Sequence, residues 1–292
     1  MSQPAAADAL ELLKPITWFA PMWAFGCGVI SAGAPFEVER VPALAVGVLV
    51  AGPLVCGTSQ AVNDWFDRHV DAINEPHRPI PSGRIPGRWG LYIALAWTAV
   101  SLMAATLLGP VGFAAAVFAV VMAWAYSAPP TRLKRNGWWG NSAVAICYEG
   151  VPWFTGATVA VAAMPDARIV LVALLYSVGA HGIMTLNDFK SVRGDTAMGL
   201  RSLPVQLGVE RAARLACWVM ALPQVAVVAL LLSWGRPVYA IVVTGLLAAQ
   251  FALMVRLLRA PAERAAWYNA TGTMLYVLGM LATAFCLRGL VQ

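Results

Sequence analysis

Residues 43–63 read ALAVGVLVAGPLVCGTSQAVN, a run of 21 residues without a charged side chain, and the next eight residues read DWFDRHVD. A helix of about 20 apolar residues is long enough to cross the hydrocarbon core of a bilayer. The acidic residues therefore begin where such a helix would leave the membrane. This stretch predicts a membrane-spanning fold with a polar site at the membrane surface.

The whole chain repeats this apolar pattern. Of its 292 residues, 60% are hydrophobic and 12% are charged, which is too apolar for a soluble domain of this length. Backbone groups in a bilayer must be hydrogen-bonded within their own segment, and the sequence lacks the alternating pattern of a membrane barrel, so we expect helices. We predict an all-α polytopic membrane protein with nine transmembrane helices in one bundle, forming a single domain over residues 1–292. The nine predicted spans are Ile16–Gly33, Ala43–Asn63, Trp89–Leu108, Val111–Ala128, Asn141–Ala163, Ile169–Asn187, Leu215–Trp234, Pro237–Val255 and Ala270–Leu287.

Basic residues indicate the side of the membrane on which each loop lies, because positively charged loops stay in the cytoplasm. With the N-terminus inside, 16 of the 20 Lys and Arg residues fall in inner segments and 4 in outer segments. The odd number of spans then places the C-terminus outside. Short basic loops beside spans, in a chain with a net charge of +6, favour membrane lipid and an anionic substrate as partners and argue against nucleic acid.

Two long inner loops, after the second and sixth predicted spans, open with related sequences. Residues 63–71 read NDWFDRHVD and residues 187–195 read NDFKSVRGD, and an offset of 124 aligns them. The one acid without a counterpart is Asp67, which aligns with Ser191. Repetition within a chain indicates a duplicated unit. We therefore predict two related halves, each of which brings an acidic segment to the cytoplasmic side.

The first acidic segment carries Asp64, Asp67 and Asp71 at the spacing i, i+3 and i+7, so a continuing helix would project three carboxylates from one face. Such a cluster repels itself beside a low-dielectric membrane unless a cation neutralises it. Oxygen ligands suit Mg²⁺, which also bridges to substrate phosphates. Together with Asp188 and Asp195 of the second segment, these acids are predicted to bind Mg²⁺. The alternative is that they only pair with arginines of the loops.

Basic side chains in the same loops supply the other half of a site for a diphosphate. The arginine side chain is planar and suits phosphate oxygens, whereas lysine supplies a point charge. Taken singly, each basic residue could equally anchor an inner loop. As a set that converges with two acidic segments, they predict a metal-bound diphosphate. The predicted diphosphate-binding residues are Arg78, Arg84, Lys134, Arg135, Lys190 and Arg201.

Two further ionisable residues, Glu149 and His181, fall inside predicted spans. Such residues are costly in a bilayer and are functional candidates for that reason. The alternative is a packing role in which each side chain bonds to a neighbouring helix.

These motifs resemble a known family. The motif Asn63-Asp64-x-x-Asp67-x-x-x-Asp71 resembles the first aspartate motif of the UbiA-type intramembrane prenyltransferases, and the resemblance extends over nearly the whole chain. The strings NEPHRPIPSG at residues 74–83 and RSLPV at residues 201–205 look like the chlorophyll-synthase branch of that family. The strings CYEGVPW at residues 147–153 and GAHG at residues 179–182 look most like its bacterial members.

The second aspartate motif departs from the pattern of the family. Many members have acids at both ends of an Asp-x-x-x-Asp, whereas Ser191 stands at the first of these positions here. Asp188 is the nearby acid that could replace it as a metal ligand.

The resemblance implies a reaction and a site. Geranylgeranyl or phytyl diphosphate would react with the propionate carboxylate of bacteriochlorophyllide or chlorophyllide, giving an ester and pyrophosphate, with Mg²⁺ as cofactor. It implies an integral protein of a bacterial inner membrane, cytoplasmic or intracytoplasmic and photosynthetic, with its active site facing the cytoplasm. It also implies the catalytic residues Asp64, Asp67, Asp71, Asp188 and Asp195, the same acids with Asn63 as metal ligands, Tyr126 as a further diphosphate-binding residue, and Glu149 and His181 in the pocket for the acceptor.

Two other functions are compatible with parts of this pattern. An aromatic prenyltransferase that makes a quinone precursor would use the same diphosphate site with a phenolic acceptor. A transporter could also combine repeats with intramembrane acids, but its site is expected near the middle of the membrane. The acids here lie at span ends beside basic loops, which favours the enzyme.

Overall fold

The computed structural model describes residues 3–35 and 37–291, and the regular secondary structure in them is helical, apart from one isolated parallel bridge between Asn136 and Arg201. The prediction of an all-α fold is therefore confirmed. The α-helices are α1 Ala6–Leu12, α2 Phe19–Ser31, α3 Val41–Leu49, α4 Gly57–Asn74, α5 Trp89–Ala105, α6 Gly109–Ser127, α7 Gly137–Ala145, α8 Val151–Val161, α9 Ala167–Asn187, α10 Val192–Ala197, α11 Leu203–Leu207, α12 Val209–Ser233, α13 Pro237–Leu258 and α14 Pro261–Val291. The 3₁₀ segments are η1 Pro15–Thr17, η2 Val38–Arg40, η4 Thr106–Leu108, η5 Leu133–Arg135 and η7 Asp188–Ser191, and the π-helical segments are η3 Val50–Cys56 and η6 Ile146–Gly150.

Seven helical stretches of the described residues are long and apolar enough to cross a membrane, and α2 is a shorter apolar helix. The protein is thus a polytopic, all-helical membrane protein. The seven stretches are Val38–Ile73, Trp89–Ser127, Gly137–Val161, Ala167–Ala197, Val209–Ser233, Pro237–Leu258 and Pro261–Val291.

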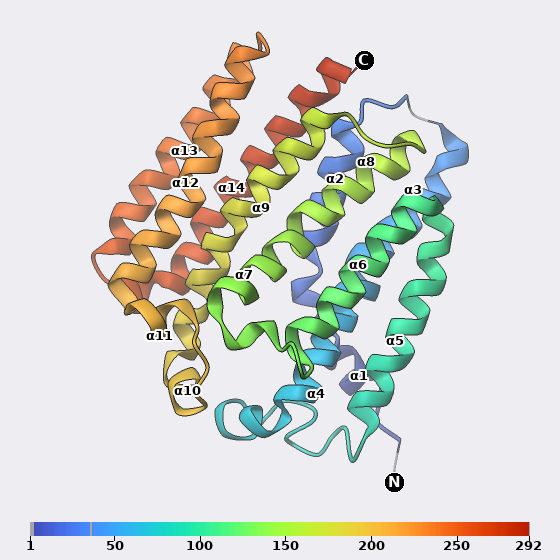
Figure 1. The fold of residues 1–292 in the computed structure, drawn as a ribbon, viewed down its shortest axis with the longest axis vertical. Coiled ribbons are helices and arrows are strands. Elements are labelled where there is room, and N and C mark those ends of the chain that lie inside the picture. The colour runs from blue at the N-terminus through green and yellow to red at the C-terminus, as the bar shows by residue number, and fades with distance from the viewer. Residues whose placement is uncertain (1–2, 36, 292) are drawn as a thin grey trace.

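Some of these stretches are composite. The π-helical segments η3 and η6 each join two α-helices that continue in nearly the same direction, so α3 to α4 and α7 to α8 each form one long element (Figure 1). The stretch Trp89–Ser127 instead reverses direction. Gly109 has a φ of +75°, which favours glycine, and α5 and α6 run antiparallel on either side of it.

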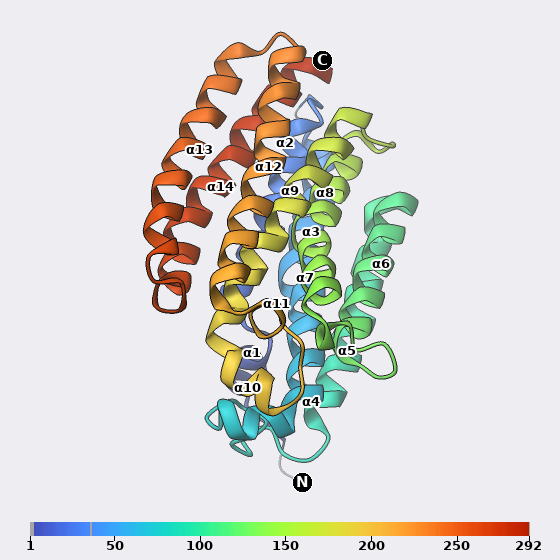
Figure 2. The same ribbon diagram turned by 60° about the vertical axis from the view of Figure 1, so that its left-hand side comes forward.

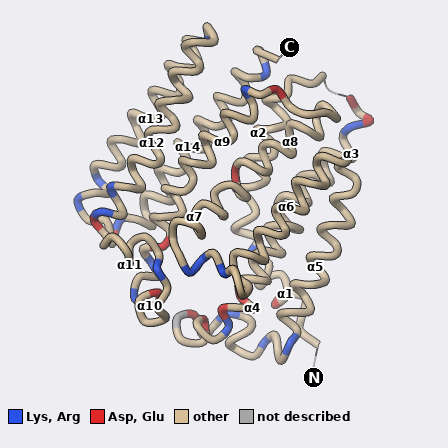
Figure 3. Tube along the Cα trace, in the orientation of Figure 1, with Lys and Arg blue, Asp and Glu red and all other residues tan. Residues whose placement is uncertain are grey.

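The long helices form a bundle whose axes follow the long dimension of the molecule (Figures 1 and 2). The N-terminus lies at one end of the bundle and the C-terminus at the other. The C-terminal part of α4, together with α10 and α11, lies at the end that carries the N-terminus. Figure 3 shows that many of the charged residues gather at this same end. The helices thus bring the two acidic segments to one end of the bundle.

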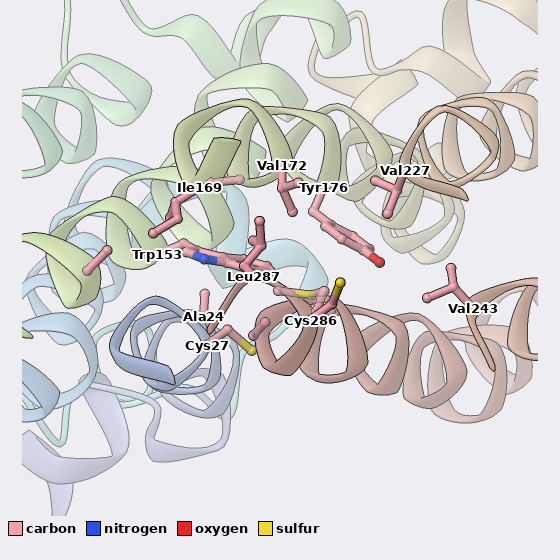
Figure 4. Packing of buried hydrophobic residues seen from close by; sticks show 14 of the residues in the cluster. Ala24, Cys27, Trp153, Ile169, Val172, Tyr176, Val227, Val243, Cys286 and Leu287 are labelled. Atoms are coloured by element: carbon pink, nitrogen blue, oxygen red, sulfur yellow. The ribbon is translucent and has the colours of Figure 1, made fainter. Parts of the chain in front are cut away.

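A cluster of buried hydrophobic side chains packs α2, α8, α9, α12, α13 and α14 together (Figure 4). Trp153 of α8 is fully buried and stacks on Tyr176 of α9 at 5.7 Å, and Tyr176 meets Tyr276 of α14 edge-on at 5.3 Å. Their polar atoms are satisfied. Trp153 Nε1 donates to Ser31 Oγ at 3.0 Å, and the Tyr276 hydroxyl donates to the Tyr176 carbonyl at 2.6 Å. Buried polar tips that are paired in this way fix the relative positions of the helices.

The short helix α2 is held in the bundle by close contact with α8. A Cβ atom added to Gly28 would lie 2.0 Å from the carbonyl oxygen of Trp153, and one added to Gly156 would lie 2.1 Å from the carbonyl oxygen of Phe25. Only glycine permits this approach of two backbones, as is common between helices in membranes.

The N-terminal helix α1 packs across the charged end of the bundle. Leu12 and Leu13 are buried against Ala61 and Val62 of α4. The residue that follows, Lys14, has a left-handed backbone conformation with a φ of 48°. A positive φ is uncommon for a residue other than glycine, and such strain is concentrated at functional sites. This packing brings Lys14 beside the acidic part of α4.

Candidate functional site

The first acidic segment is helical, as the sequence predicts. Helix α4 continues through Asn74 and therefore carries Asp64, Asp67 and Asp71 on one face. Asp64 and Asp71 are buried, with 1% and 6% of their surface exposed, and Asp67 is partly buried. Three carboxylates so placed need positive charge nearby.

A separate cation lies against each of these acids. Lys14 Nζ lies 2.6 Å from Asp64 Oδ1, and Lys134 Nζ lies 2.7 Å from Asp67 Oδ2. Arg78 Nη1 lies 2.9 Å from Asp71 Oδ2 and 3.6 Å from Asp64 Oδ1. The sequence predicts Lys134 and Arg78 at the site. The sequence does not predict Lys14 at the site, because Lys14 lies 50 residues before Asp64 and reaches it only through the packing of α1.

Lys134 also joins other predicted site residues. Its Nζ donates to Ser127 Oγ at 3.3 Å, the same oxygen to which Asn63 Nδ2 donates at 3.3 Å, and it lies 5.8 Å from the centre of the Tyr126 ring. Burial lowers the pKa of Lys134, against the attraction of the Asp67 carboxylate. Asn63, Tyr126 and Lys134 thus converge around Ser127 and Asp67, as expected for one binding site.

The second acidic segment differs in its local structure. Helix α9 ends at Asn187, a 3₁₀ turn covers Asp188–Ser191, and α10 then carries Asp195. The Asp188 carboxylate accepts a hydrogen bond from Nδ2 of the buried Asn141, at 3.0 Å. The sequence motifs do not indicate Asn141 as a site residue, although it is the first residue of the fifth predicted span.

The two acidic segments lie near each other. The carboxylates of Asp67 and Asp195 are close enough to interact electrostatically, and Tyr126 lies near both of them and near Asp188. Residues far apart in the sequence therefore form one acidic centre, with Asp67 at the junction. This convergence is what the aligned segments predict.

Backbone pairing fixes the basic loops beside this centre. Arg201 N donates to the Arg135 carbonyl at 2.9 Å, and Gly137 N donates to the Arg201 carbonyl at 2.8 Å. A Cβ atom on Gly137 would lie 2.5 Å from Leu203 N, so glycine is required where the two loops touch. The side chains of Arg135, Lys190 and Arg201 are exposed and, within residues 3–35 and 37–291, form no ion pair with an acid.

Arg84 occupies a different environment. Its Nη1 lies 2.6 Å from Asp8 Oδ1 and 2.6 Å from Glu11 Oε2, and its Nη2 donates to Glu11 Oε1 at 2.8 Å. The hydrogen bond from Arg84 lowers the pKa of Glu11. The guanidinium therefore fastens α1 to the loop after α4, and it does not face the acids of α4.

The acidic centre suits a divalent cation that prefers oxygen ligands. No three His, Cys, Asp or Glu side chains of the described residues lie close enough to hold a metal, since cationic side chains lie between the acids of α4. Asp64 Oδ2 nevertheless is buried without a hydrogen-bond partner. A buried carboxylate oxygen without a hydrogen-bond partner is stabilised by a bound ligand or cation. Carboxylate and amide oxygens are the ligands that Mg²⁺ prefers. The type of donor atom, and the unpartnered Asp64 oxygen, therefore fit Mg²⁺.

The two ionisable residues inside the spans face different neighbours. Glu149 lies in the π-helical segment η6 with 5% of its surface exposed, near Cys27 and Tyr276, and its Oε2 has no hydrogen-bond partner. His181 of α9 is 8% exposed, and its ring lies 5.9 Å from that of Trp138. The structure places them on separate elements.

An apolar groove lies on the membrane side of the acidic centre. Val50, Ala51 and Val55 of η3 line it, together with residues of α2, α6, η6 and α8. Val55 precedes Asn63 by about two turns, or about 12 Å of helix.

The profile of the UbiA prenyltransferase family matches residues 18–286. The chain belongs to the UbiA prenyltransferase family. It is 60% identical to the bacteriochlorophyll synthase 33 kDa chain of Cereibacter sphaeroides, an alignment that covers 99% of this chain and 95% of that protein. It is 39% identical to the chloroplastic chlorophyll synthase of Oryza sativa, over 94% of this chain and 75% of the relative.

The fold also matches solved structures. A UbiA homologue from Archaeoglobus fulgidus, bound to GPP and Mg²⁺, superposes with a TM-score of 0.72 at 19% identity, over 97% of this chain and 99% of that one. At this identity the match concerns the fold alone, and it agrees with the helical architecture described above.

Proposed function

We propose that this prenyltransferase moves a geranylgeranyl or phytyl group from its diphosphate to the propionate carboxylate of bacteriochlorophyllide, in a reaction that depends on Mg²⁺. The observation that carries the chemistry is the pairing of Asp67 with Lys134, beside Tyr126 and near Asp195 of the second acidic segment. The acceptor is inferred from similarity, since the chain is 60% identical to a bacteriochlorophyll synthase subunit and 39% identical to a chlorophyll synthase.

The acidic centre would hold the metal. Mg²⁺, when bound, supplies positive charge that stabilises a departing diphosphate. The amide of Asn63 would assist by holding Ser127 in place, as its hydrogen bond to that hydroxyl indicates. The proposed metal ligands are Asn63, Asp64, Asp67, Asp71, Asp188 and Asp195.

The basic residues would bind the diphosphate oxygens as the bond between oxygen and the prenyl carbon breaks. Positive groups that are already in place where charge develops are an effective source of catalysis. Lys14 belongs with this set, because it already lies against Asp64. Arg84 is assigned to holding α1. The proposed diphosphate-binding residues are Lys14, Arg78, Tyr126, Lys134, Arg135, Lys190 and Arg201.

The acceptor needs no strong base. A carboxyl group titrates near pH 4 and is already ionised at neutral pH, so its oxygen can attack the prenyl carbon directly. One bond between carbon and oxygen forms the ester while another breaks to release pyrophosphate. The apolar groove along η3 would exclude water from the prenyl chain, which protects the electrophilic carbon from hydrolysis.

For the architecture we propose nine membrane crossings in one domain over residues 1–292, built from two related halves. The reversal at Gly109 supports two crossings within Trp89–Ser127, and the contact of α2 with α8 supports a further crossing by the short helix. The related acidic segments support the two halves. The proposed location is a bacterial inner membrane, with the acidic centre on the cytoplasmic side.

This orientation gives a prediction for the C-terminus. A reporter enzyme fused after residue 292 is expected to be active only as a periplasmic protein, because the basic residues lie mainly at the other end of the bundle (Figure 3). A matched fusion within the loop at residues 82–88 is expected to behave as cytoplasmic. Cytoplasmic behaviour of the C-terminal fusion would show that the number of crossings or their orientation is wrong.

A product assay tests the proposed activity. Purified protein in detergent would be incubated with geranylgeranyl diphosphate, Mg²⁺ and either bacteriochlorophyllide, chlorophyllide or a phenolic quinone precursor, and products identified by mass. We expect a prenyl ester of bacteriochlorophyllide, its loss in a chelator and its return with added Mg²⁺. A product from the phenolic acceptor alone would replace this proposal with an aromatic prenyltransferase, and full turnover in the chelator would remove the metal from it.

A further inference from the structure

His181 differs from the other two histidines of the chain. His69 and His77 are exposed, whereas His181 lies within α9 and is buried. Its ring is within hydrogen-bonding reach of the backbone of Trp138. The Trp138 N–H is already donated to Asn136 Oδ1 at 3.0 Å, so the carbonyl of Trp138 is the backbone group left to accept from the ring.

This contact leaves one ring nitrogen unused. A neutral imidazole that donates from one nitrogen keeps a lone pair on the other, and no other hydrogen bond or ion pair of the His181 ring occurs in the described residues. A histidine whose second nitrogen is fixed by a backbone carbonyl is the usual arrangement of a metal ligand. Packing alone requires no such free nitrogen inside the bundle.

The protein provides no further ligands for a metal here. No group of three His, Cys, Asp or Glu side chains that could hold a metal is found within residues 3–35 and 37–291. A metal at His181 would therefore have to arrive with its other ligands. A metallotetrapyrrole meets this condition, because four ring nitrogens hold the metal and an axial position stays open for a histidine, as in haem proteins.

The surroundings of His181 suit a flat macrocycle. The indole of Trp138 lies 5.9 Å from the imidazole with an angle of 31° between the ring planes. Trp138 is 43% exposed, and its neighbour Trp139 is 67% exposed. Because the plane of an axial imidazole stands perpendicular to the macrocycle, an indole tilted by only 31° from that imidazole would meet the macrocycle edge-on, which is a favourable aromatic arrangement.

The position along α9 agrees with the chemistry of the acceptor. His181 lies six residues, or about 9 Å, before the end of α9 at Asn187, and Asp188 follows directly in the 3₁₀ turn. Asn141 of α7 contacts both Thr185 and Asp188, at 3.4 and 3.0 Å. A macrocycle held at His181 could thus extend its propionate arm along α7 and α9 towards the acidic centre.

We propose that His181 is the axial ligand of the central magnesium of the bacteriochlorophyllide acceptor, with the macrocycle against Trp138. This inference rests on the proposed function, since it assumes a tetrapyrrole acceptor. It makes His181 a residue that selects the metallated pigment and positions its propionate.

Binding of two pigments to the purified protein tests this role. Bacteriochlorophyllide and its magnesium-free counterpart would each be titrated in detergent, without a prenyl donor, while absorption bands that report magnesium coordination are followed. The wild type is expected to bind the metallated pigment at least about 10-fold more tightly and to shift those bands. His181→Ala is expected to lose both effects and to regain the band shift with added imidazole, whereas the control His77→Ala keeps both.

The outcomes separate the two proposals. Equal binding of both pigments by the wild type, with ester formation intact, would overturn the role of His181 and leave the proposed function standing. The same holds if His181→Ala keeps the preference and the band shift. If the wild type binds neither pigment and forms no pigment ester, both proposals fail. The comparison of pigments on the wild type does not depend on the folding of any variant.

Discussion

Asp67→Ala is expected to lower kcat by about 10²-fold or more, the cost of removing one group that stabilises charge in a transition state. Asp67 is the acid that connects the parts of the site. Its carboxylate lies 2.7 Å from Lys134 Nζ and close enough to Asp195 to interact with it. Its loss removes a proposed metal ligand and also leaves Lys134 without its acid. Steady-state kinetics with the pigment and prenyl diphosphate would measure the effect, with a smaller change expected in KM.

Two further variants make this result interpretable. Asp67→Asn keeps the shape of the side chain without its charge and is expected to be nearly as impaired. Asp166→Ala is the matched control, because Asp166 also pairs with an arginine, Arg168 at 2.9 Å, but lies before the start of α9, at the opposite end of that helix from Asp188. Normal activity of Asp67→Ala in folded protein would remove Asp67 from the site, and an equal loss in Asp166→Ala would show a general effect on folding.

Asp188→Ala and Asp195→Ala are expected to be severe, by about 10²-fold or more in kcat, whereas Ser191→Ala is expected to be mild. Asp188 has the environment of a positioned ligand, since Asn141 donates to it at 3.0 Å. The Ser191 side chain makes no hydrogen bond in the described part of the chain. The turn over Asp188–Ser191 is a 3₁₀ helix, in which residues three apart lie one above the other. An acid at either position could therefore serve the same site.

The geometry of this turn allows a rescue experiment. Ser191→Asp is expected to restore part of the activity that Asp188→Ala loses, since it returns a carboxylate to the same side of the turn. Asn141→Ala should cost about 10-fold, as is usual when the partner of a metal ligand is removed. A large loss of kcat in Ser191→Ala, together with normal kcat in Asp188→Ala, would show that the ligands of the second segment are assigned wrongly.

Local patterns in the sequence were enough to predict the class of fold and the first half of the site. Long apolar runs specify membrane helices because a bilayer cannot solvate an open backbone. The spacing of Asp64, Asp67 and Asp71 predicts one helical face, and α4 does continue through all three. Such features depend on residues close together in the chain, so they can be read without knowing how the helices pack.

The basic partners of these acids could not be predicted from local sequence patterns. Lys14 reaches Asp64 because Leu12 and Leu13 bury α1 against α4, and Arg84 turns away from the acids because Asp8 and Glu11 of the same helix bind it. The sequence placed Arg84 with the diphosphate-binding residues because loop position alone does not reveal which way a side chain faces.

The sequence by itself determined the helices, the two acidic segments and the end of the molecule at which they lie, because each depends on a local pattern of charge and hydrophobicity. Only the tertiary structure decided which partners meet. Asp67 pairs with Lys134, Asn141 donates a hydrogen bond to Asp188, and His181 packs beside Trp138. These contacts join residues that are distant in the chain. They depend on how whole helices pack, and packing is fixed by the summed fit of many side chains, such as the close approach of α2 and α8 at Gly28, and not by any one stretch of sequence.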